Sequence, residues 1–265
     1  MTMLDDGATE EAAALLWRHW QEGRRLDALP VPLRPSSRAE GYAIQARLEG
    51  RDGRPLFGWK IAATSQAGQA HIGVDGPLGG RILASRVFAE GAEVPLGANA
   101  MLVAEPEFVF RLARDLPPRP APYSQAEVMA AVGALHLGIE VPDSRFEDFA
   151  RAGGPQLIAD NACAHQFVLG PEAAGDWRGL DLAAHPVTAR VGDRYAREGI
   201  GANVLGDPRI ALAWLANELA THGPGLAAGQ YVTTGTCMVP LEIRPGDAVR
   251  ADFGRLGSVA VRFIA

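Results

Sequence analysis

Short apolar segments bounded by turn-forming residues are the feature that most constrains the fold of this chain of 265 residues. Each segment has the length of a β-strand, and Gly, Pro, Asn or Asp at its ends favours a turn. The strands expected on this pattern are 56–64, 101–112, 136–141, 162–169, 187–191, 231–234, 248–253 and 258–263. The last two flank the turn Gly254-Arg-Leu-Gly257 and should pair. The chain therefore needs a β-rich core.

Helical patterns occur mainly in the first part of the chain. Residues 10–24 carry apolar side chains at helical spacing, and Ser37 and Glu40 have the spacing of a capping box that starts a second helix. One later helix is expected to begin at Ser124, and another to span 207–223 with an N-cap, a first-turn proline and a C-terminal glycine.

The change of pattern near residue 55 divides the chain into two parts. Residues 1–55 are expected to form a small helical N-terminal part, and residues 56–265 a β-rich core. The sequence holds no internal repeat and no low-complexity linker between the two. The fold class expected from the residues is therefore α+β.

Composition narrows the kinds of partner. A net charge of −6 argues against nucleic acid, and no apolar run approaches the roughly 20 residues of a membrane-spanning helix. The start, Met1-Thr-Met-Leu-Asp-Asp, lacks the basic and then apolar stretches of a signal segment. Two cysteines are too few for a disulfide scaffold. We expect a cytoplasmic protein that acts on a small molecule, without nucleic acid or membrane partners.

One basic residue differs from all the others. Of 25 basic residues only Lys60 is a lysine, and the rest are arginine. Codon usage alone can explain a bias to arginine, and Lys60 can be a chance survivor on the surface. Lysine, however, offers a compact ammonium whose pKa shifts on burial, whereas arginine stays charged. We interpret Lys60 as a candidate catalytic residue.

Two carboxylates lie in the expected strand 101–112. Glu105 and Glu107 are two residues apart, so an extended chain points both to one face. Pro106 between them cannot donate to a neighbouring strand, which indicates an edge strand or a bulge. The surrounding residues are apolar, and paired buried acids need a compensating cation. The alternative is that both acids face solvent on an edge strand.

A third acid, Glu140, ends another apolar strand just before a proline. A glutamate in this place is often a solvated strand cap. Three carboxylates and water, however, make the oxygen-rich site that Mg²⁺ or Mn²⁺ prefers, and no zinc-like spacing of Cys and His occurs. Cys163 and His165 are expected on one face of the strand 162–169, as a small core residue and a structural histidine.

Several motifs together resemble the 2-keto-4-pentenoate hydratase family, within the fumarylacetoacetate-hydrolase-like superfamily. They are Gly58-Trp-Lys60-Ile, His71-Ile-Gly-Val-Asp75-Gly-Pro77, Glu105-Pro-Glu107, Gly138-Ile-Glu140-Val, Asp160-Asn-Ala162, Thr234-Gly235 and Arg244-Pro-Gly-Asp247. The resemblance runs from about residue 42 to 263. It implies a mixed β-roll or β-sandwich core of the fumarylacetoacetate-hydrolase type, a role in aromatic catabolism, and homo-oligomers built from dimers.

The resemblance also implies roles for single residues. The metal-binding glutamates of the family fall on Glu105, Glu107 and Glu140, and its active-site lysine falls on Lys60. A Mg²⁺ or Mn²⁺ ion in such a site would hold a 2-keto acid and stabilise its enolate, after which water adds to a conjugated enone. Lys60 would neutralise oxyanion charge or move a proton.

The chain departs from the family pattern at two positions. Leu78 stands where hydratases of the family carry an acid, and Cys163 stands where they carry a serine. The missing acid weakens the case for hydration but not for metal-bound keto-acid chemistry. Asp75 is a candidate substitute for that acid and is assigned a catalytic role, although an Asp before Gly is also a common turn residue.

Three functions remain open on this sequence. The first is hydration of a 2-hydroxydienoate or related 2-keto acid. The second applies the same enolate chemistry to decarboxylation or to hydrolysis of a carbon–carbon bond. Hydrolysis is disfavoured because the stretch 30–37 lacks the histidine expected of a hydrolase lid. The third is a non-catalytic subunit that binds a metal and a keto acid.

Overall fold

Two β-sheets and six α-helices make up the protein in a computed structural model that describes residues 4–265. The helices are α1 (Asp6–Glu22), α2 (Arg38–Asp52), α3 (Gln66–Ile72), α4 (Gln125–Ala131), α5 (Gly154–Ala159) and α6 (Pro208–His222). The strands are β1 (Gly58–Ala62), β2 (Leu78–Ile82), β3 (Val87–Ala89), β4 (Glu93–Pro95), β5 (Val103–Leu112), β6 (Val132–Val141), β7 (Gln166–Glu172), β8 (Pro186–Val191), β9 (Tyr195–Ile200), β10 (Tyr231–Thr236), β11 (Leu241–Glu242), β12 (Ala248–Asp252) and β13 (Ser258–Ile264). Residues 1–3 lie outside the described residues. They belong to the N-terminal stretch in which no signal segment is expected.

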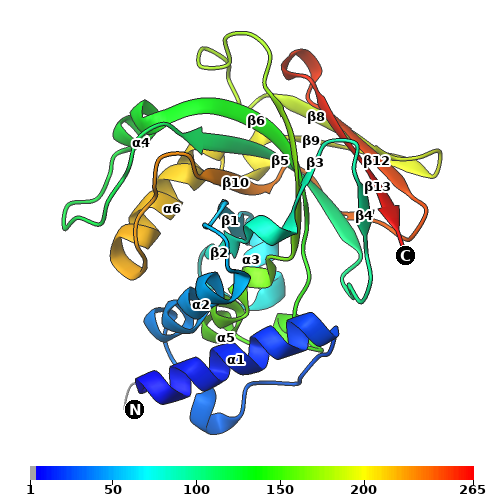
Figure 1. Ribbon diagram of the computed structural model, residues 1–265. Coiled ribbons are helices and arrows are strands. Elements are labelled where there is room, and N and C mark those ends of the chain that lie inside the picture. The colour runs from blue at the N-terminus through cyan, green and yellow to red at the C-terminus, as the bar shows by residue number, and fades with distance from the viewer. Residues whose placement is uncertain (1–3) are drawn as a thin grey trace.

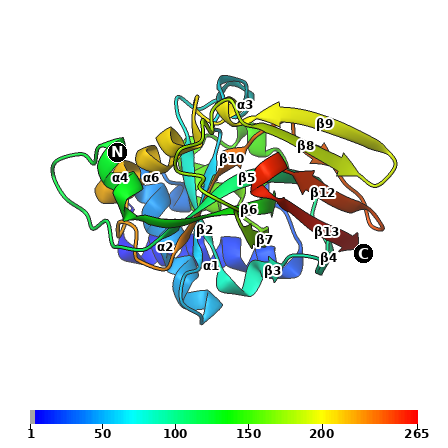
Figure 2. The same ribbon diagram turned by 90° about the horizontal axis from the view of Figure 1, so that it is seen from above.

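The larger sheet has the strand order β2-β1-β10-β5-β6-β7-β3, with β11 paired to β5, and the smaller has the order β4-β13-β12-β8-β9. The larger sheet curves over the N-terminal helices, and the smaller sheet stands to one side of it (Figure 1). Seen from above, the β8–β9 hairpin extends away from the body of the protein (Figure 2). The expected α+β class with a β-rich core is confirmed.

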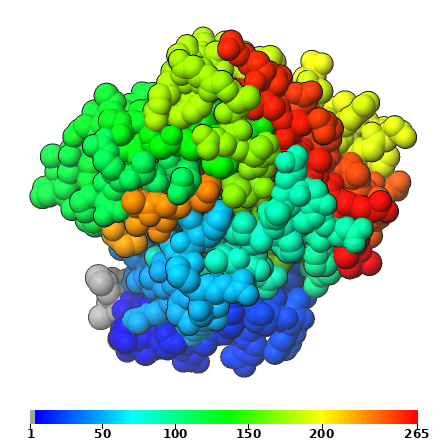
Figure 3. All heavy atoms as spheres, turned by 45° about the horizontal axis from the view of Figure 1, so that its top comes forward, coloured from blue at the N-terminus to red at the C-terminus, as the bar shows by residue number. Residues whose placement is uncertain are grey.

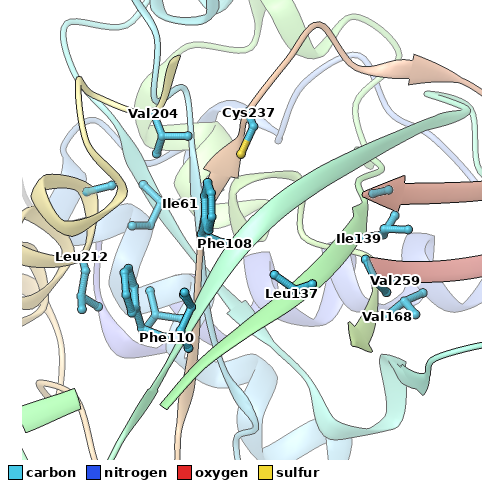
Figure 4. Close-up of a cluster of buried hydrophobic side chains, with 14 of the residues drawn as sticks. Ile61, Phe108, Phe110, Leu137, Ile139, Val168, Val204, Leu212, Cys237 and Val259 are labelled. Carbon is cyan, nitrogen blue, oxygen red and sulfur yellow. The ribbon is translucent and has the colours of Figure 1, made fainter. Parts of the chain in front are cut away.

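The main hydrophobic core lies on one face of the larger sheet. Side chains alternate along β5, so Phe108 and Phe110 point into this core while the residues between them face the other way. Phe108 packs edge-on against Phe253 beside the smaller sheet, with ring centroids 5.1 Å apart. Leu212 of α6 covers another part of the same cluster (Figure 4). The opposite face of β5 is thus left for other side chains.

Helices α2 and α4 begin where the capping signals predict. Ser37 accepts a hydrogen bond from the backbone N–H of Glu40 at the start of α2, and Ser124 and Glu127 form a complete capping box at the start of α4. The first helices share a hydrophobic cluster with Phe146, which lies beyond the first half of the chain. In the space-filling view the N-terminal residues form the lower side of the molecule, beneath the strands (Figure 3). The proposed boundary near residue 55 stays a prediction.

The expected strand 162–169 is wrong in its first part. Strand β7 begins only at Gln166, and Asn161–Cys163 forms a 3₁₀ turn with positive φ angles. His165 therefore does not share a strand face with Asn161 and Cys163. A backbone held in the left-handed region cannot continue a strand, and nothing in the apolar pattern marks this. Among residues 4–265, no helix is long and apolar enough to cross a membrane.

Candidate metal centre

The three glutamates predicted from the sequence meet on the face of the larger sheet opposite the main core. Glu105 of β5 pairs directly with Glu140 of β6, and Glu107 lies two residues further along β5. Paired residues and second neighbours on one strand share a sheet face. One carboxylate oxygen from each glutamate lies within 4.8 Å of the others. The structure thus brings all three acids together.

The carboxylate group is buried and largely without hydrogen-bond partners. Glu107 is 0% exposed and Glu140 is 2% exposed, while Glu105 is half-buried. Within residues 4–265, Glu107 Oε1 and Glu140 Oε2 lack a hydrogen-bond partner, and Glu140 Oε1 meets only the Lys60 ammonium. Buried oxygens of this kind are unstable unless a cation or a donor meets them. Three convergent hard oxygen ligands fit Mg²⁺ or a similar cation.

The electrostatics of the group agree with this interpretation. Burial, followed by the charge of Glu140, raises the pKa of Glu105 to about 7. Burial is also the first cause that raises the pKa of Glu107 well above its usual value and raises the pKa of Glu140. The nearby Lys60 ammonium opposes each rise. Without a metal, therefore, the single positive charge of Lys60 does not neutralise the three carboxylates.

Lys60 stands on β1, facing the carboxylates, and is 3% exposed. Its Nζ lies 3.0 Å from Glu140 Oε1 as an ion pair and donates a hydrogen bond of 3.0 Å to the carbonyl of Ala162. Burial alone would lower the pKa of Lys60, but the carboxylates, Glu140 first, raise it above the usual value. The single lysine predicted from composition is therefore a charged group inside the site.

A bulge in β10 brings a backbone hydrogen-bond donor to the carboxylate group. The pairing of β10 with β5 slips by one residue between Thr233 and Thr236. Within the bulge, the backbone N–H of Gly235 donates to Glu107 Oε2 at 2.7 Å. Gly235 has φ 104°, and a Cβ there would lie 2.1 Å from the Thr64 hydroxyl, so only glycine fits. This donor was missed from the sequence, although the Thr-Gly pair belonged to the motif set.

Pro106 does not mark an edge strand. Strand β5 lies inside the larger sheet, between β6 and β10, so the expectation of an edge is wrong. A bulge lies close by, but in the neighbouring strand β10, and Pro106 itself pairs regularly with Ile139 of β6. The Pro106 carbonyl still accepts a hydrogen bond of 3.1 Å from the Cys237 N–H. The missing proline donor is therefore tolerated where regular pairing with β10 is interrupted.

The remaining predicted residues lie in different surroundings. Asp75 is exposed in a bend after α3, outside the carboxylate group, so its catalytic role stays a prediction. Leu78 is 1% exposed and belongs to an apolar cluster with Tyr42 and Ala162. Cys163 is half-buried beside the same cluster, and burial first of all raises the pKa of its thiol to about 12. A thiol of this kind is a poor nucleophile.

His165 lies behind the site. Its Nδ1 accepts a hydrogen bond of 2.7 Å from the Trp20 indole, which places the histidine against α1. Burial, with three arginines nearby, lowers its pKa well below the usual value. A neutral histidine fixed in this way suits a structural role.

Comparison with known proteins agrees with the fold. A family described as fumarylacetoacetate (FAA) hydrolase C-terminal matches residues 80–264. The chain is 33% identical to 2-keto-4-pentenoate hydratase 1 of Dechloromonas aromatica (strain RCB), over 97% of both chains. It is 31% identical to a 4-oxalocrotonate decarboxylase of a Pseudomonas species, over 87% of this chain and 86% of the other.

A solved structure resembles the whole chain. It is the 4-oxalocrotonate decarboxylase from Pseudomonas putida G7 complexed with magnesium and adipate, with a TM-score of 0.89, 26% identity and complete coverage of both chains. The sequence relatives and the family match together cover the helices, both sheets and all three glutamates. The chain therefore belongs to the 2-keto-4-pentenoate hydratase family, within the fumarylacetoacetate hydrolase superfamily.

Proposed function

We propose that this protein is a Mg²⁺- or Mn²⁺-dependent hydratase that adds water to a 2-hydroxydienoate or a related 2-keto acid. The observation that carries the proposal is the group of three convergent carboxylates, two buried and one half-buried, with unpartnered oxygens, beside the only lysine of the chain. The family to which the chain belongs supports the same chemistry. The expected homo-oligomer built from dimers and the cytoplasmic location stay predictions.

Glu105, Glu107 and Glu140 would hold the cation. A bound divalent cation supplies Lewis-acid polarisation of the substrate carboxylate and keto oxygen. The protein prepares for this by shielding the carboxylates of Glu107 and Glu140 from bulk water and leaving Glu107 Oε1 and Glu140 Oε2 without a donor. The Gly235 N–H fixes one oxygen of Glu107 and so limits rotation of that side chain.

Lys60 would act on the substrate oxygen. Its ammonium carries three N–H donors, of which one meets the Ala162 carbonyl and another faces Glu140. The third is available to a substrate oxygen that gains negative charge, or to carry a proton to the adjacent carbon. In both roles the buried ammonium acts in a site of low dielectric, where its charge has a larger effect than in water.

Decarboxylation of a 2-keto acid is the second candidate. It is favoured by Leu78, because the family's acid for proton transfer to water is replaced there by an apolar side chain in an apolar cluster. A drier site suits loss of carbon dioxide better than addition of water. The two reactions share the metal group and Lys60, so the products must separate them.

The test is product analysis by mass spectrometry. The Mg²⁺-loaded full chain is incubated with 2-hydroxypenta-2,4-dienoate, longer 2-hydroxydienoates and 4-oxalocrotonate. Gain of water supports the hydratase, and loss of carbon dioxide instead shows the decarboxylase. Glu107→Gln serves as the inactive control, and Glu93→Gln, on an exposed strand carboxylate, as the matched active control. If Mg²⁺ binds but no substrate is converted, the catalytic proposal is wrong. The function left is then that of a non-catalytic subunit that binds a metal and a keto acid.

A further inference from the structure

Three consecutive residues beside the site adopt a left-handed backbone. Asn161, Ala162 and Cys163 have φ angles of 59°, 50° and 61°, and none of them is a glycine. Residues with a Cβ enter this region singly and at a conformational cost. A run of three persists only where surrounding contacts hold it. We call residues 161–163 the left-handed turn.

Arg145 holds the two ends of the left-handed turn. Its guanidinium donates to the carboxylate and the carbonyl of Asp160, before the turn, and to the carbonyl of Ala164, after it, at 3.1 Å. Arg145 is 1% exposed, and Ser144 adds a hydrogen bond of 2.7 Å to the Asp160 carboxylate. A planar guanidinium with fixed donors suits such a clamp, because its geometry leaves the two carbonyls little freedom.

Asn161 fastens the turn to strand β2. Its side-chain oxygen accepts from the backbone N–H of Arg81 at 2.6 Å, and its side-chain nitrogen donates to the carbonyl of the same residue at 2.9 Å. Gly80 allows this close approach, because a Cβ there would lie 2.3 Å from the Asn161 carbonyl oxygen. Gly80 is also the direct strand partner of Lys60. The turn is therefore fixed to the strand beside the lysine.

The result is that the Ala162 carbonyl faces the Lys60 ammonium at 3.0 Å. We propose that the left-handed turn is a positioning device for Lys60, with Asn161 and Arg145 as positioning residues. A lysine side chain has four rotatable bonds, and two acceptors in different directions, the Ala162 carbonyl and Glu140, restrict its ammonium. Its third donor then points in a fixed direction. The inference rests on the proposed function only in that Lys60 must act on the substrate.

The first experiment measures turnover of Asn161→Gly. Glycine adopts φ 59° without strain, so this change removes the buried amide and its two hydrogen bonds but leaves the backbone conformation accessible. We expect kcat to fall by about 10- to 100-fold with KM nearly unchanged, because misplacement of a reacting group by about 1 Å has an effect of this size. The matched control is Asn217→Ala. The Asn217 amide makes the same pair of hydrogen bonds with Tyr123, at 2.7 and 3.0 Å, far along the chain on α6.

The second experiment follows the lysine directly. Because the chain contains one lysine, lysine labelled with ¹³C at Cε gives a single resonance that needs no assignment. We expect restricted motion at Cε in the wild type and in Asn217→Ala, and faster motion in Asn161→Gly. Asn161→Asp, which keeps the acceptor for the Arg81 N–H but loses the donor, should lie between these limits. It also serves if Asn161→Gly does not fold.

The third experiment places Asn161→Gly in a Lys60→Met background. If the turn acts through Lys60, the effect of Asn161→Gly on the residual rate disappears there. An equal loss in both backgrounds, or an unchanged lysine resonance in Asn161→Gly, overturns the positioning inference. If Lys60→Met keeps the wild-type rate, the proposed role of Lys60 fails instead, and the lysine resonance still shows whether the turn restrains the side chain.

Discussion

Replacing Glu107 by Gln should raise the stability of the metal-free protein while it removes the response to metal. Glu107 and Glu140 are buried, Glu105 is half-buried, and one carboxylate oxygen of each lies within 4.8 Å of the others. Two unit charges at this separation repel by about 3 kcal/mol at an effective dielectric constant of about 20. Burial also raises the pKa of Glu107, so part of this repulsion is already relieved by a bound proton. We therefore expect a gain of about 1–2 kcal/mol.

The amide of Gln retains the local contacts. Its oxygen can accept from the Gly235 N–H as Glu107 Oε2 does, and its NH₂ group can donate to a neighbouring carboxylate. For a chain of this size, a gain of about 1–2 kcal/mol raises Tm by about 2–8 °C. Wild type should instead gain about 2.7 kcal/mol, or about 5–10 °C, when Mg²⁺ is raised to 100 times its Kd. The variant should show no such rise.

The assay is thermal unfolding followed by circular dichroism, in chelator and across a Mg²⁺ titration, with isothermal titration calorimetry to measure Mg²⁺ binding. Glu93→Gln is the control, because this β4 carboxylate is 65% exposed and its one ion pair, with Arg262, is long at 3.8 Å. It should change neither Tm nor the Mg²⁺ response. A Glu107→Gln protein that melts below wild type in chelator and still gains stability with Mg²⁺ would show that the glutamate group is not the metal site.

Three other changes test separate parts of the structure. Lys60→Arg should lower kcat by about 100-fold or more with little change in Tm, because the charge is kept but a guanidinium does not give up a proton, and a near-normal rate would show that charge alone suffices. The pKa of Glu40 is lowered from 4.5 to about 2, mainly by hydrogen bonds from Ser36. Its stabilisation is therefore present above pH 4.5 and is lost as the pH falls towards 2, so Glu40→Gln should flatten the acid side of the curve of Tm against pH. Leu78→Asp should destabilise the fold by about 3 kcal/mol or more, measured by urea unfolding, because it buries a carboxylate in an apolar cluster. A rise in hydration of 2-hydroxypenta-2,4-dienoate over Leu78→Asn would indicate a hydratase site that lacks its acid, and equal rates in the two variants would contradict this.

Most of the central strands could be predicted because their pattern is local. Strands β5, β12 and β13 lie where apolar segments end at turn residues, and period two along β5 places Glu105 and Glu107 on one face. Strand β2 was not expected, since Leu78-Gly-Gly has neither length nor alternation. Such a strand forms because β1 offers it a partner and because Gly80 admits a close neighbour. That information is not local.

The site was predictable in its residue types but not in its geometry. Composition identified Lys60, whereas its ion pair with Glu140 depends on the order of strands in the sheet. Its place at the end of an apolar strand indicated Glu140 as a third acid and the family resemblance assigned it to the metal group, but only the register of β5 with β6 places it opposite Glu105. The left-handed turn could not be predicted, because Arg145 and Asn161 impose it through contacts with distant backbone. Propensity for single residues gives no sign of such a turn.

The alternation of side chains along β5 connects stability with chemistry. Phe108 and Phe110 fill the main core on one face, and the same alternation forces Glu105 and Glu107 onto the other. A register slip by one residue would bury both acids in the main core and move both aromatic rings to the carboxylate face, so the aromatic packing selects the register that assembles the carboxylate group. The acids repel one another, but burial of the two aromatic rings on the opposite face of the same strand stabilises the register that brings the acids together. A divalent cation that binds the carboxylates would remove the strain that the strand register imposes.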